Sequence, residues 1–239
     1  MIGGEFPSHI QPTAFEQRGL AERVRADAIL SGLPASTRCA GAPAPLTAPA
    51  WQDVEAGLRW TLETVGPTTI VAIKPDGPTA GMYLDHVTLP DVVPWATTRN
   101  NAEWNLYFHV NQPRSGLAKK AAKADIVAIR AAAFLDIDAK GGRNMEEALA
   151  AITALPLPPP SVIIASGGGY QPIWLLAAPM PPELEVVARV ESLGRRLEPL
   201  AGSDHVSHID RLLRLPFTMN HPNAAKRAAG RGVSFSGLL

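Results

Sequence analysis

Apolar residues recur at helical spacing in some stretches of the chain and form short continuous runs in others. The helical spacing predicts helices over residues 13–30, 51–64 and 182–200. The short runs predict strands over residues 68–73, 81–89, 105–111, 132–138, 161–166 and 170–176. Elements of both kinds predict a mixed α/β fold, and a chain of 239 residues is long enough to bury a hydrophobic core.

Local signals sharpen several of these boundaries. Asn144 is a good helix cap, and Glu147 stands at the third helical position, so we expect a helix to begin there. The three glycines at 167–169 separate the last two strands and predict a hairpin. Because Pro172 has no N–H to donate, it favours an edge position for the second strand of that hairpin. Residues 33–50, rich in proline and alanine, predict a linker or a surface arm.

The composition is that of a globular protein. Apolar residues make up 46% of the chain and charged residues 18%, and no apolar run reaches the ~18 residues that a membrane helix requires. The 22 basic and 22 acidic side chains cancel, so nucleic-acid binding would depend on a local basic patch. Cys39 is the only cysteine, and the start of the chain lacks a signal-peptide pattern, so we expect a cytoplasmic protein without an intrachain disulfide.

Two acids close the predicted strand over residues 132–138. Side chains two apart on a strand point to the same face, so Asp136 and Asp138 are expected to project together. Neighbouring carboxylates repel each other, and such a pair binds a divalent cation or takes up a proton. Hard oxygen ligands suit Mg²⁺ or Mn²⁺. The alternative is a pair of solvated acids at a strand end.

The glycine-rich hairpin turn is the second block that suggests chemistry. It reads SGGGYQ from Ser166 to Gln171, and its glycines let backbone N–H groups approach a phosphate or a sugar closely. The turn lacks the Gly-Lys-Ser/Thr ending of a P-loop. The alternative is a flexible turn with no ligand.

Residues 204–220 (DHVSHIDRLLRLPFTMN) form the third block. Arg211 and Arg214 carry guanidinium groups, which suit bidentate recognition of phosphate. A helix would place the two arginines on one face, and an extended segment would place them on opposite faces. Asp204 and Asp210 are acids that could complete a metal site. The alternative is a surface helix with ordinary ion pairs.

In this order the three blocks resemble the archaeo-eukaryotic primase superfamily, and most closely the primase-polymerase domains of phages, plasmids and other mobile elements. That family has a D-x-D or D-x-E motif at a strand end, then a turn of the S-G-x-G-Y-H type before an aromatic-containing strand. An acid follows, and then R-x-x-R-L-P-G-T-x-N. The corresponding residues here are Asp136 and Asp138, SGGGYQ leading into Trp174, Asp204, and RLLRLPFTMN at 211–220. The resemblance covers residues 105–227.

The resemblance implies an α/β (α+β) fold of two subdomains within residues 51–239. An N-terminal α/β subdomain, about 51–125, would pack across an RRM-like catalytic sheet, about 126–239, to form a nucleotide cleft. Residues 1–50 would be an N-terminal helix and arm. The implied activity is template-directed nucleotidyl transfer from (d)NTPs on single-stranded DNA, in the replication of a phage, plasmid or other mobile element. Many relatives join this domain to a helicase, so a helicase is an expected partner.

The resemblance also implies roles for single residues. Asp136, Asp138 and Asp204 would bind two divalent ions, Mg²⁺ or Mn²⁺, with Asp210 as the reserve choice for Asp204. The residues expected to bind the nucleotide are Ser166, Gly168, Gln171, Arg211, Arg214 and Asn220. Those expected along the template backbone are Lys140, Arg143, Lys226 and Arg227, for which the alternative is solvated surface charge. Candidate groups for stacking on bases are Trp95, Trp104 and Tyr170, for which the alternative is a place in the core.

Two residues depart from the family pattern. Gln171 stands where many members carry a histidine that contacts the phosphates of the nucleotide, and an amide cannot carry positive charge. Phe217 replaces the usual glycine after Leu-Pro and is expected to change the turn and to add a stacking surface. Both departures favour a rival function, a catalytically weak replication-initiation or single-stranded-DNA-binding module of the same fold. A second rival is a different Mg²⁺-dependent phosphotransferase or nuclease built on the same acids.

Overall fold

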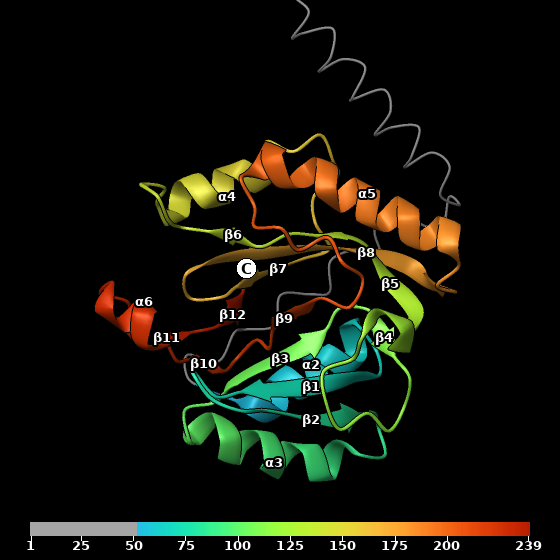
Figure 1. Ribbon diagram of the computed structural model, residues 1–239, viewed down its shortest axis with the longest axis vertical. Helices are drawn as coiled ribbons and strands as arrows, with labels where there is room; N and C mark the ends of the chain where they lie inside the picture. Colours follow the sequence, from blue (N-terminus) through green and yellow to red (C-terminus); the bar gives the residue numbers. More distant parts are fainter. Residues whose placement is uncertain (1–51) are drawn as a thin grey trace, which may run out of the picture. The chain divides into compact units, whose positions relative to one another are not determined.

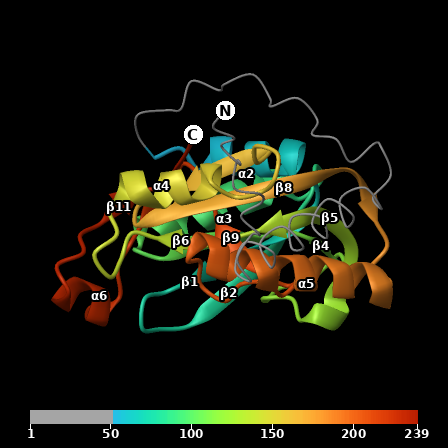
Figure 2. The same ribbon diagram turned by 90° about the horizontal axis from the view of Figure 1, so that it is seen from above.

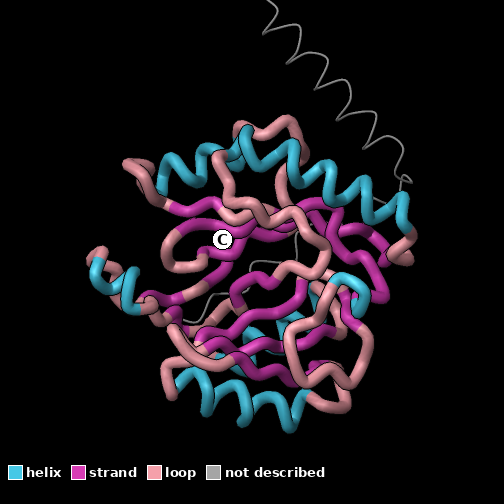
Figure 3. The backbone as a smooth tube through the Cα atoms, viewed as in Figure 1, coloured by secondary structure: helices cyan, strands magenta, loops and turns pink. Residues whose placement is uncertain are grey.

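The structure, a computed structural model, describes residues 52–239, whose strands form two larger antiparallel sheets (Figure 1). The tube view shows the strands gathered between two groups of helices (Figure 3). Among the described helices, none has the length and apolar character needed to cross a membrane. The helix predicted over residues 13–30 and the arm over 33–50 lie outside the described residues. The predicted mixed α/β fold is confirmed.

The first sheet has the strand order β2-β1-β3-β9. Its strands are β1 (Thr68–Ile73), β2 (Thr79–Leu84), β3 (Asn105–His109) and β9 (Leu212–Arg214). Helices α2 (Val54–Thr64) and α3 (Leu89–Asn101) pack beside it. The late strand β9 pairs with β3, with Tyr107 opposite Arg214. A strand from the C-terminal part of the chain thus completes the sheet of the N-terminal part. The predicted boundary between two subdomains near residue 125 stays a prediction.

The second sheet has the order β12-β7-β8-β5-β4, and β6 also pairs with β8. Its strands are β4 (Gln112–Pro113), β5 (Ile126–Phe134), β6 (Ile137–Asp138), β7 (Val162–Ala165), β8 (Gly169–Met180) and β12 (Gly237–Leu238). Helices α4 (Met145–Thr153) and α5 (Leu184–Ala201) cover one face of this sheet (Figures 1 and 2). Two helices on one face of an antiparallel sheet agree with the RRM-like sheet that the resemblance implied.

Short elements connect the sheets. The 3₁₀ helix η2 (Lys123–Asp125) precedes β5, and α6 (Ala224–Ala228) lies between β10 (Met219–Asn220) and β11 (Ser234–Phe235). β10 and β11 pair with each other in a ribbon of two strands. The C-terminal segment therefore returns to the body of the structure through both β11 and β12.

The hydrophobic core lies in two layers. The larger cluster joins the first sheet, its helices and the near face of the second sheet, through side chains such as Phe108, Ile129 and Leu213. The smaller cluster fills the space between the second sheet and helices α4 and α5, with Ile137 and Leu193 among its members. The second sheet is thus packed on both faces, which holds its position relative to the first sheet.

Several element boundaries follow directly from local chemistry. Asn144 Oδ1 accepts the Glu147 N–H at 2.9 Å, and the Glu147 carboxylate accepts the Asn144 N–H at 2.9 Å, so the predicted capping box is confirmed. Helix α3 was not predicted, because it contains Pro90 and Pro94. Pro90 lies in the first turn, where a missing N–H costs no helical hydrogen bond.

The predicted edge position of Pro172 is wrong. Its strand, β8, is an interior strand that pairs with β7 on one side and with β5 and β6 on the other. The Pro172 carbonyl accepts the Leu135 N–H at 3.2 Å, at the interruption between β5 and β6. The nitrogen and the carbonyl of a strand residue point to the same neighbouring strand, so the nitrogen of Pro172 also faces the interruption between β5 and β6. No strand hydrogen bond is therefore lost because proline lacks an N–H.

His109, in the last position of β3, is fully buried. Its Nε2 accepts the Ala121 N–H at 2.9 Å. Burial, and then the charge of Lys120, lower the pKa of His109 to about 4, against the opposing effect of Asp210. The imidazole is therefore neutral in the folded protein at any pH above about 5.

We expect His109 to make folding stability fall as the pH drops. The unfolded chain binds a proton on this residue below its ordinary pKa of 6.5, whereas the folded protein does so only near pH 4. The free energy of unfolding should therefore lose about 2 kcal/mol through His109 between pH 7.5 and pH 5. His109→Gln keeps an acceptor for the Ala121 N–H without titrating, so urea unfolding of this variant should show a pH dependence smaller by that amount. His86→Gln, at an exposed position, is the control, and an unchanged pH dependence in His109→Gln would contradict the assignment.

Candidate active site

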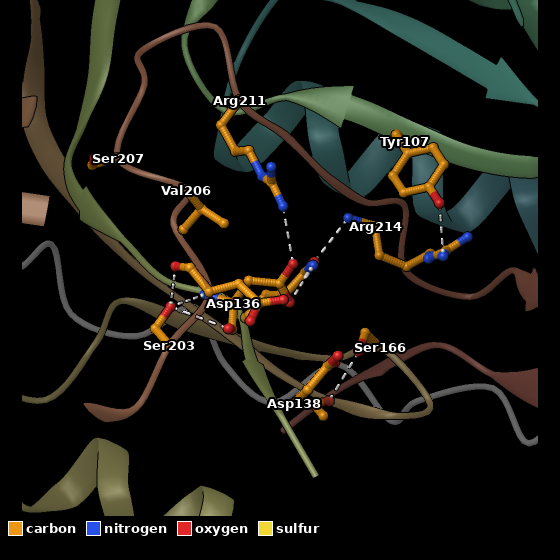
Figure 4. A network of polar contacts seen from close by, with 12 residues as sticks. Tyr107, Asp136, Asp138, Ser166, Ser203, Val206, Ser207, Arg211 and Arg214 are labelled. Atoms are coloured by element: carbon orange, nitrogen blue, oxygen red, sulfur yellow. Dashed lines mark hydrogen bonds and ion pairs between the residues drawn. The ribbon is translucent and has the colours of Figure 1, made fainter. Parts of the chain in front are cut away.

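Three acids come together where β5 gives way to β6. Asp136 lies between the two strands, Asp138 lies on β6, and Asp204 lies in the loop between α5 and β9. The Asp204 N–H donates to the Asp136 carbonyl at 2.9 Å. The Ser203 hydroxyl accepts the Asp136 N–H at 2.9 Å and lies 3.1 Å from the Asp136 carbonyl oxygen (Figure 4). These contacts join the loop of Asp204 to the D-x-D segment.

The reserve choice, Asp210, lies elsewhere. Its charge acts on His109, and it is not among the groups that act on Asp138. Asp204, in contrast, shares an ion-pair partner with Asp138, because Lys140 Nζ contacts the Asp204 carboxylate and lies 3.8 Å from Asp138 Oδ2. Of the two acids considered for the third position, the structure brings Asp204 to the pair.

The charges of Asp136 and Asp204 act on Asp138. Burial raises the pKa of Asp138, and the carboxylates of Asp136 and Asp204 raise it further. Lys140 and Arg231 act in the opposite direction. A partly buried carboxyl among other carboxyls is the environment in which a nearby cation is most stabilising.

Protein cations neutralise this acidic cluster in the structure. The Lys140 ammonium lies between Asp138 and Asp204, and Arg211 Nη2 donates to Asp136 Oδ2 at 3.1 Å. Within residues 52–239, no group of three or more histidine, cysteine, aspartate or glutamate side chains is arranged as a metal cage. The oxygen donors suit a divalent cation in kind, but their side chains would have to turn from these protein partners to bind one. The predicted Mg²⁺ or Mn²⁺ ions stay a prediction.

Gln171 connects the acids to the other sheet. This side chain is 5% exposed, its Nε2 donates to Asp136 Oδ1 at 3.1 Å, and its Oε1 accepts the Arg214 N–H at 2.8 Å. The amide thus joins β8 of the second sheet to β9 of the first. Both ends have protein partners, so a direct contact of Gln171 with a nucleotide stays a prediction.

The two arginines flank Asp136 from the first sheet, and the segment that carries them is extended rather than helical. Arg211 precedes β9, and Arg214 is buried on it, stacked 4.3 Å from the ring centre of Tyr107 with Nη2 at 2.9 Å from the phenol oxygen (Figure 4). Burial lowers the pKa of Arg214, while Tyr107 and Asp136 act to raise it. Nε and Nη1 of Arg214 and Nε of Arg211 are buried without a hydrogen-bond partner in the described part of the chain. Unpaired guanidinium N–H groups of this kind are suited to an anion.

The glycine-rich turn lies directly against β6. The Ser166 N–H donates to the Gly169 carbonyl at 2.9 Å, and the Asn220 amide donates to the Ser166 carbonyl at 2.8 Å. A Cβ on Gly169 would lie 2.2 Å from the Ile137 carbonyl oxygen, so only glycine allows this approach. The turn is therefore an ordered hairpin held close to Asp138.

The four residues expected to contact the template differ in their surroundings. Lys140 pairs with the acids, and Arg143 Nη1 donates to the Ala201 carbonyl at 2.9 Å, at the end of α5. Lys226 and Arg227 lie exposed on α6. The last two remain accessible to a strand, and the role of all four stays a prediction.

The aromatic candidates differ in their burial. Tyr170 is 9% exposed, whereas Trp95 and Trp104 are partly buried and both contact Arg99, whose guanidinium carbon is 4.1 and 5.7 Å from their ring centres. Phe217 is 1% exposed, so the stacking surface expected of it is wrong. Its φ of 61° is in the left-handed region that favours glycine, and its ring is directed into the core.

Buried glutamates of α5 hold the loop that carries Asp204. Glu198 Oε1 accepts the N–H groups of Val206 and Ser207 at 2.8 and 2.9 Å, and its Oε2 lies 2.9 Å from His205 Nδ1. Burial acts to raise the pKa of Glu198, but these hydrogen bonds outweigh it and lower the pKa. Sequence reasoning missed Glu198 and Ser203, because a helix acid and a loop serine carry no motif.

Sequence reasoning also missed a cavity of about 340 Å³ beside Asp138. The glycine turn forms one wall, and the segment after β10, with Lys226 and Arg231, forms another. The sequence signal for Arg231 is the basic, glycine-containing end of the chain, and this signal does not indicate which of its residues lines a cavity.

The sequence matches no family model and no curated protein. Among solved structures, the fold is similar to that of the crystal structure of primase RepB′, with 15% sequence identity and a TM-score of 0.53. The match covers 78% of this chain and 56% of that chain. The crystal structure of the catalytic domain of primase RepB′ in complex with initiator DNA matches with 16% identity and a TM-score of 0.49, over 75% of this chain and 82% of that chain. The chain therefore shares its fold with primase RepB′, in agreement with the fold that the order of its three motifs predicted.

Proposed function

We propose that the chain is a primase-polymerase, which transfers nucleotides from (d)NTPs to a strand on a single-stranded DNA template, in the replication of a phage, plasmid or other mobile element. The observation that carries the proposal is the gathering of three acids, Asp136, Asp138 and Asp204, beside two arginines at the junction of the two sheets. The fold that the chain shares with primase RepB′ supports it.

In this proposal Asp136, Asp138 and Asp204 hold two divalent cations, Mg²⁺ or Mn²⁺. The ions would lower the pKa of the attacking hydroxyl and neutralise the triphosphate and the leaving pyrophosphate. The protein sets the spacing of the carboxylates through the hydrogen bonds that join the Asp136 backbone to Ser203 and Asp204. Lys140, which neutralises Asp138 and Asp204 in the structure, would move aside.

The arginines supply fixed positive charge for the phosphates. Arg214 is held by Tyr107, and Arg211 is held by Asp136, so neither has to be ordered when an anion arrives. Lys226 and Arg227, exposed on α6, are proposed to contact the template backbone. A helicase, in the same or another chain, is the proposed partner.

One observation favours the rival function of a DNA-binding module with weak catalysis. The amide of Gln171 has a protein partner at each end, so the residue that replaces the family's histidine is held by Asp136 and Arg214 and carries no positive charge for phosphates. Nucleotide synthesis that requires the three acids would favour the primase-polymerase over the DNA-binding module.

We expect synthesis on single-stranded DNA to require Asp136 and Asp138. The protein, incubated with template, Mn²⁺ or Mg²⁺ and labelled nucleotides, should give metal-dependent products that vanish in the Asp136→Ala/Asp138→Ala double variant, because that variant lacks the charge that positions the cations. Products without a primer would make the protein a primase. If the wild type, folded and bound to template, gives no product with or without a primer, the binding-module function replaces this one.

The third acid can be identified by comparing two single variants. Asp204→Ala should lower the synthesis rate about 100-fold or more, because it removes a charge beside the reacting phosphates. Asp210→Ala, which removes an acid of the same loop that lies beside His109, should stay within a few-fold of the wild type. The opposite ranking, measured by initial rates at saturating metal, would assign the role to Asp210.

Gln171 should contribute to stability as well as to the site. Gln171→Met leaves the buried Arg214 N–H and one Asp136 oxygen without partners, so the free energy of unfolding in urea should fall by about 1–3 kcal/mol. Gln52→Met is the matched control, because the Gln52 amide contacts Asn101 at the surface, and its effect should stay below about 0.5 kcal/mol. Equal effects of the two variants would show that the bridge is not stabilising.

A further inference from the structure

The loop that carries Asp204 runs across one face of helix α5. A Cβ built on Gly194 would lie 2.7 Å from the Cβ of Ser207, which is closer than real Cβ atoms come, so glycine at this position lets the loop approach the helix. Glu191 precedes Gly194 by three positions and Glu198 follows it by four, and residues with this spacing lie on the same face of a helix. Both glutamates are buried. The loop therefore rests on a face of α5 that is made of one glycine and two buried acids.

Glu198 binds the chain on both sides of Asp204. Its backbone carbonyl accepts the N–H of Ser203, the residue before the acid, at 2.9 Å. Its side-chain Oε1 accepts the N–H groups of Val206 and Ser207, which follow the acid, at 2.8 and 2.9 Å. One residue of α5 thus holds the backbone of the loop before and after Asp204.

The D-x-D segment holds the same turn from the side of the sheet. The Asp204 N–H donates to the Asp136 carbonyl at 2.9 Å, and the Ser203 hydroxyl accepts the Asp136 N–H at 2.9 Å. Asp204 therefore lies between a restraint from Asp136 and a restraint from Glu198. Removal of the Glu198 side-chain bonds would leave the turn after the acid without its attachment to the helix.

The other buried glutamate of this face has a different role. Glu191 Oε1 accepts the Ile209 N–H at a long 3.4 Å, whereas it lies 2.7 Å from Lys123 Nζ. Arg195 Nη1 lies 3.8 Å from the second oxygen of Glu191. Glu191 is therefore mainly the partner of two cations, and it offers a matched comparison for Glu198.

Glu198 acts through the position of the loop rather than through its charge. It is not among the described groups whose charges act on Asp138. An oxygen with two lone pairs can accept both the Val206 and the Ser207 N–H, whether it belongs to a carboxylate or to a carboxamide. Glutamine at this position would therefore keep the two hydrogen bonds without the charge.

We propose that Glu198 is a positioning residue for the third acid of the site. Its hydrogen bonds fix the turn after Asp204, and so the place of the Asp204 carboxylate beside Asp136 and Asp138. The proposal rests on the proposed function, because that function makes Asp204 a ligand of the divalent cations. It assigns part of the site to α5, a helix that carries none of the three motifs.

The test is the binding of Mn²⁺ to the whole protein, measured by electron paramagnetic resonance without template or nucleotide, so that no synthesis is needed. Glu198→Met keeps the length of the side chain but has no strong acceptor, and it should weaken Mn²⁺ binding about 10-fold or more, the loss typical of a residue that orients a metal ligand. Glu198→Gln keeps an acceptor oxygen and should stay within about threefold of the wild type. Amide hydrogen exchange at Val206 and Ser207 should be faster in Glu198→Met than in Glu198→Gln.

Two further variants separate positioning from a general loss of stability. Glu191→Met removes the other buried glutamate of α5, so it should lower the free energy of unfolding in urea but leave Mn²⁺ affinity within about twofold of the wild type. Gly194→Ala pushes the loop away at Ser207 while Glu198 stays intact, so it should weaken Mn²⁺ binding although alanine suits a helix better than glycine. If Glu198→Met does not fold, Gly194→Ala carries the test.

The outcomes distinguish this proposal from the proposed function. Wild-type Mn²⁺ binding and synthesis in Glu198→Met, or equal losses of Mn²⁺ binding in Glu198→Met and Glu198→Gln, would overturn the positioning role and leave the proposed function intact. A loss of the same size in Glu191→Met would also overturn it, because the effect would then follow stability alone. Mn²⁺ binding that depends on the Glu198 acceptor, in a protein that makes no product, would support the positioning role and end the proposed function.

Discussion

The site depends on one side-chain amide, that of Gln171, which joins the two sheets. It donates to the carboxylate of Asp136 and accepts from the backbone of Arg214, and it is almost completely buried. A buried amide with a partner at each end has a fixed orientation, since its reversal would bring two acceptors and two donors together. The position of Asp136 relative to Arg214 is therefore held by this one side chain of β8.

The electrostatics of the site follow from the gathering of its three acids at one place. Carboxylates gathered in this way are stable only with positive charge among them, and Lys140 and Arg211 provide it. Arg214 contributes charge without a carboxylate of its own, held by the face and the hydroxyl of Tyr107. The balance of charge is thus local, although the whole chain has as many acidic as basic residues. A net charge of zero for the whole chain therefore does not reveal the opposite charges that are gathered at the site.

Local chemistry made much of the fold predictable. β1 has the bounds that its apolar run indicated, and the capping box of Asn144 and Glu147 defined the start of α4. A prediction was wrong where contacts between residues distant in sequence determine the position of a strand. Pro172 reads as an edge residue because the sequence does not show that its neighbouring strand is interrupted.

The site was predictable to the extent that its residues belong to motifs. The order of the blocks identified the acids and the arginines, and the structure brings them together. Lys140 and Arg143 could not be told from solvated charge, because their partners, Asp204 and the end of α5, lie about 60 residues away. Phe217 shows the reverse case, since a residue that departs from the motif takes up a left-handed backbone conformation that favours glycine, and the sequence does not show that its ring is buried.

The position of β9 has a consequence for the order in which the protein folds. β3 and β9 are neighbours in one sheet, yet Tyr107 and Arg214, which face each other across it, are 107 positions apart. Closing so long a loop carries an entropic cost that must be met before the pairing stabilises anything, so contacts of this separation form late and slow the folding of a domain. Arg211 and Arg214 reach Asp136 only through this pairing. A chain in which β9 has not yet paired would therefore hold the acids without these two arginines beside Asp136.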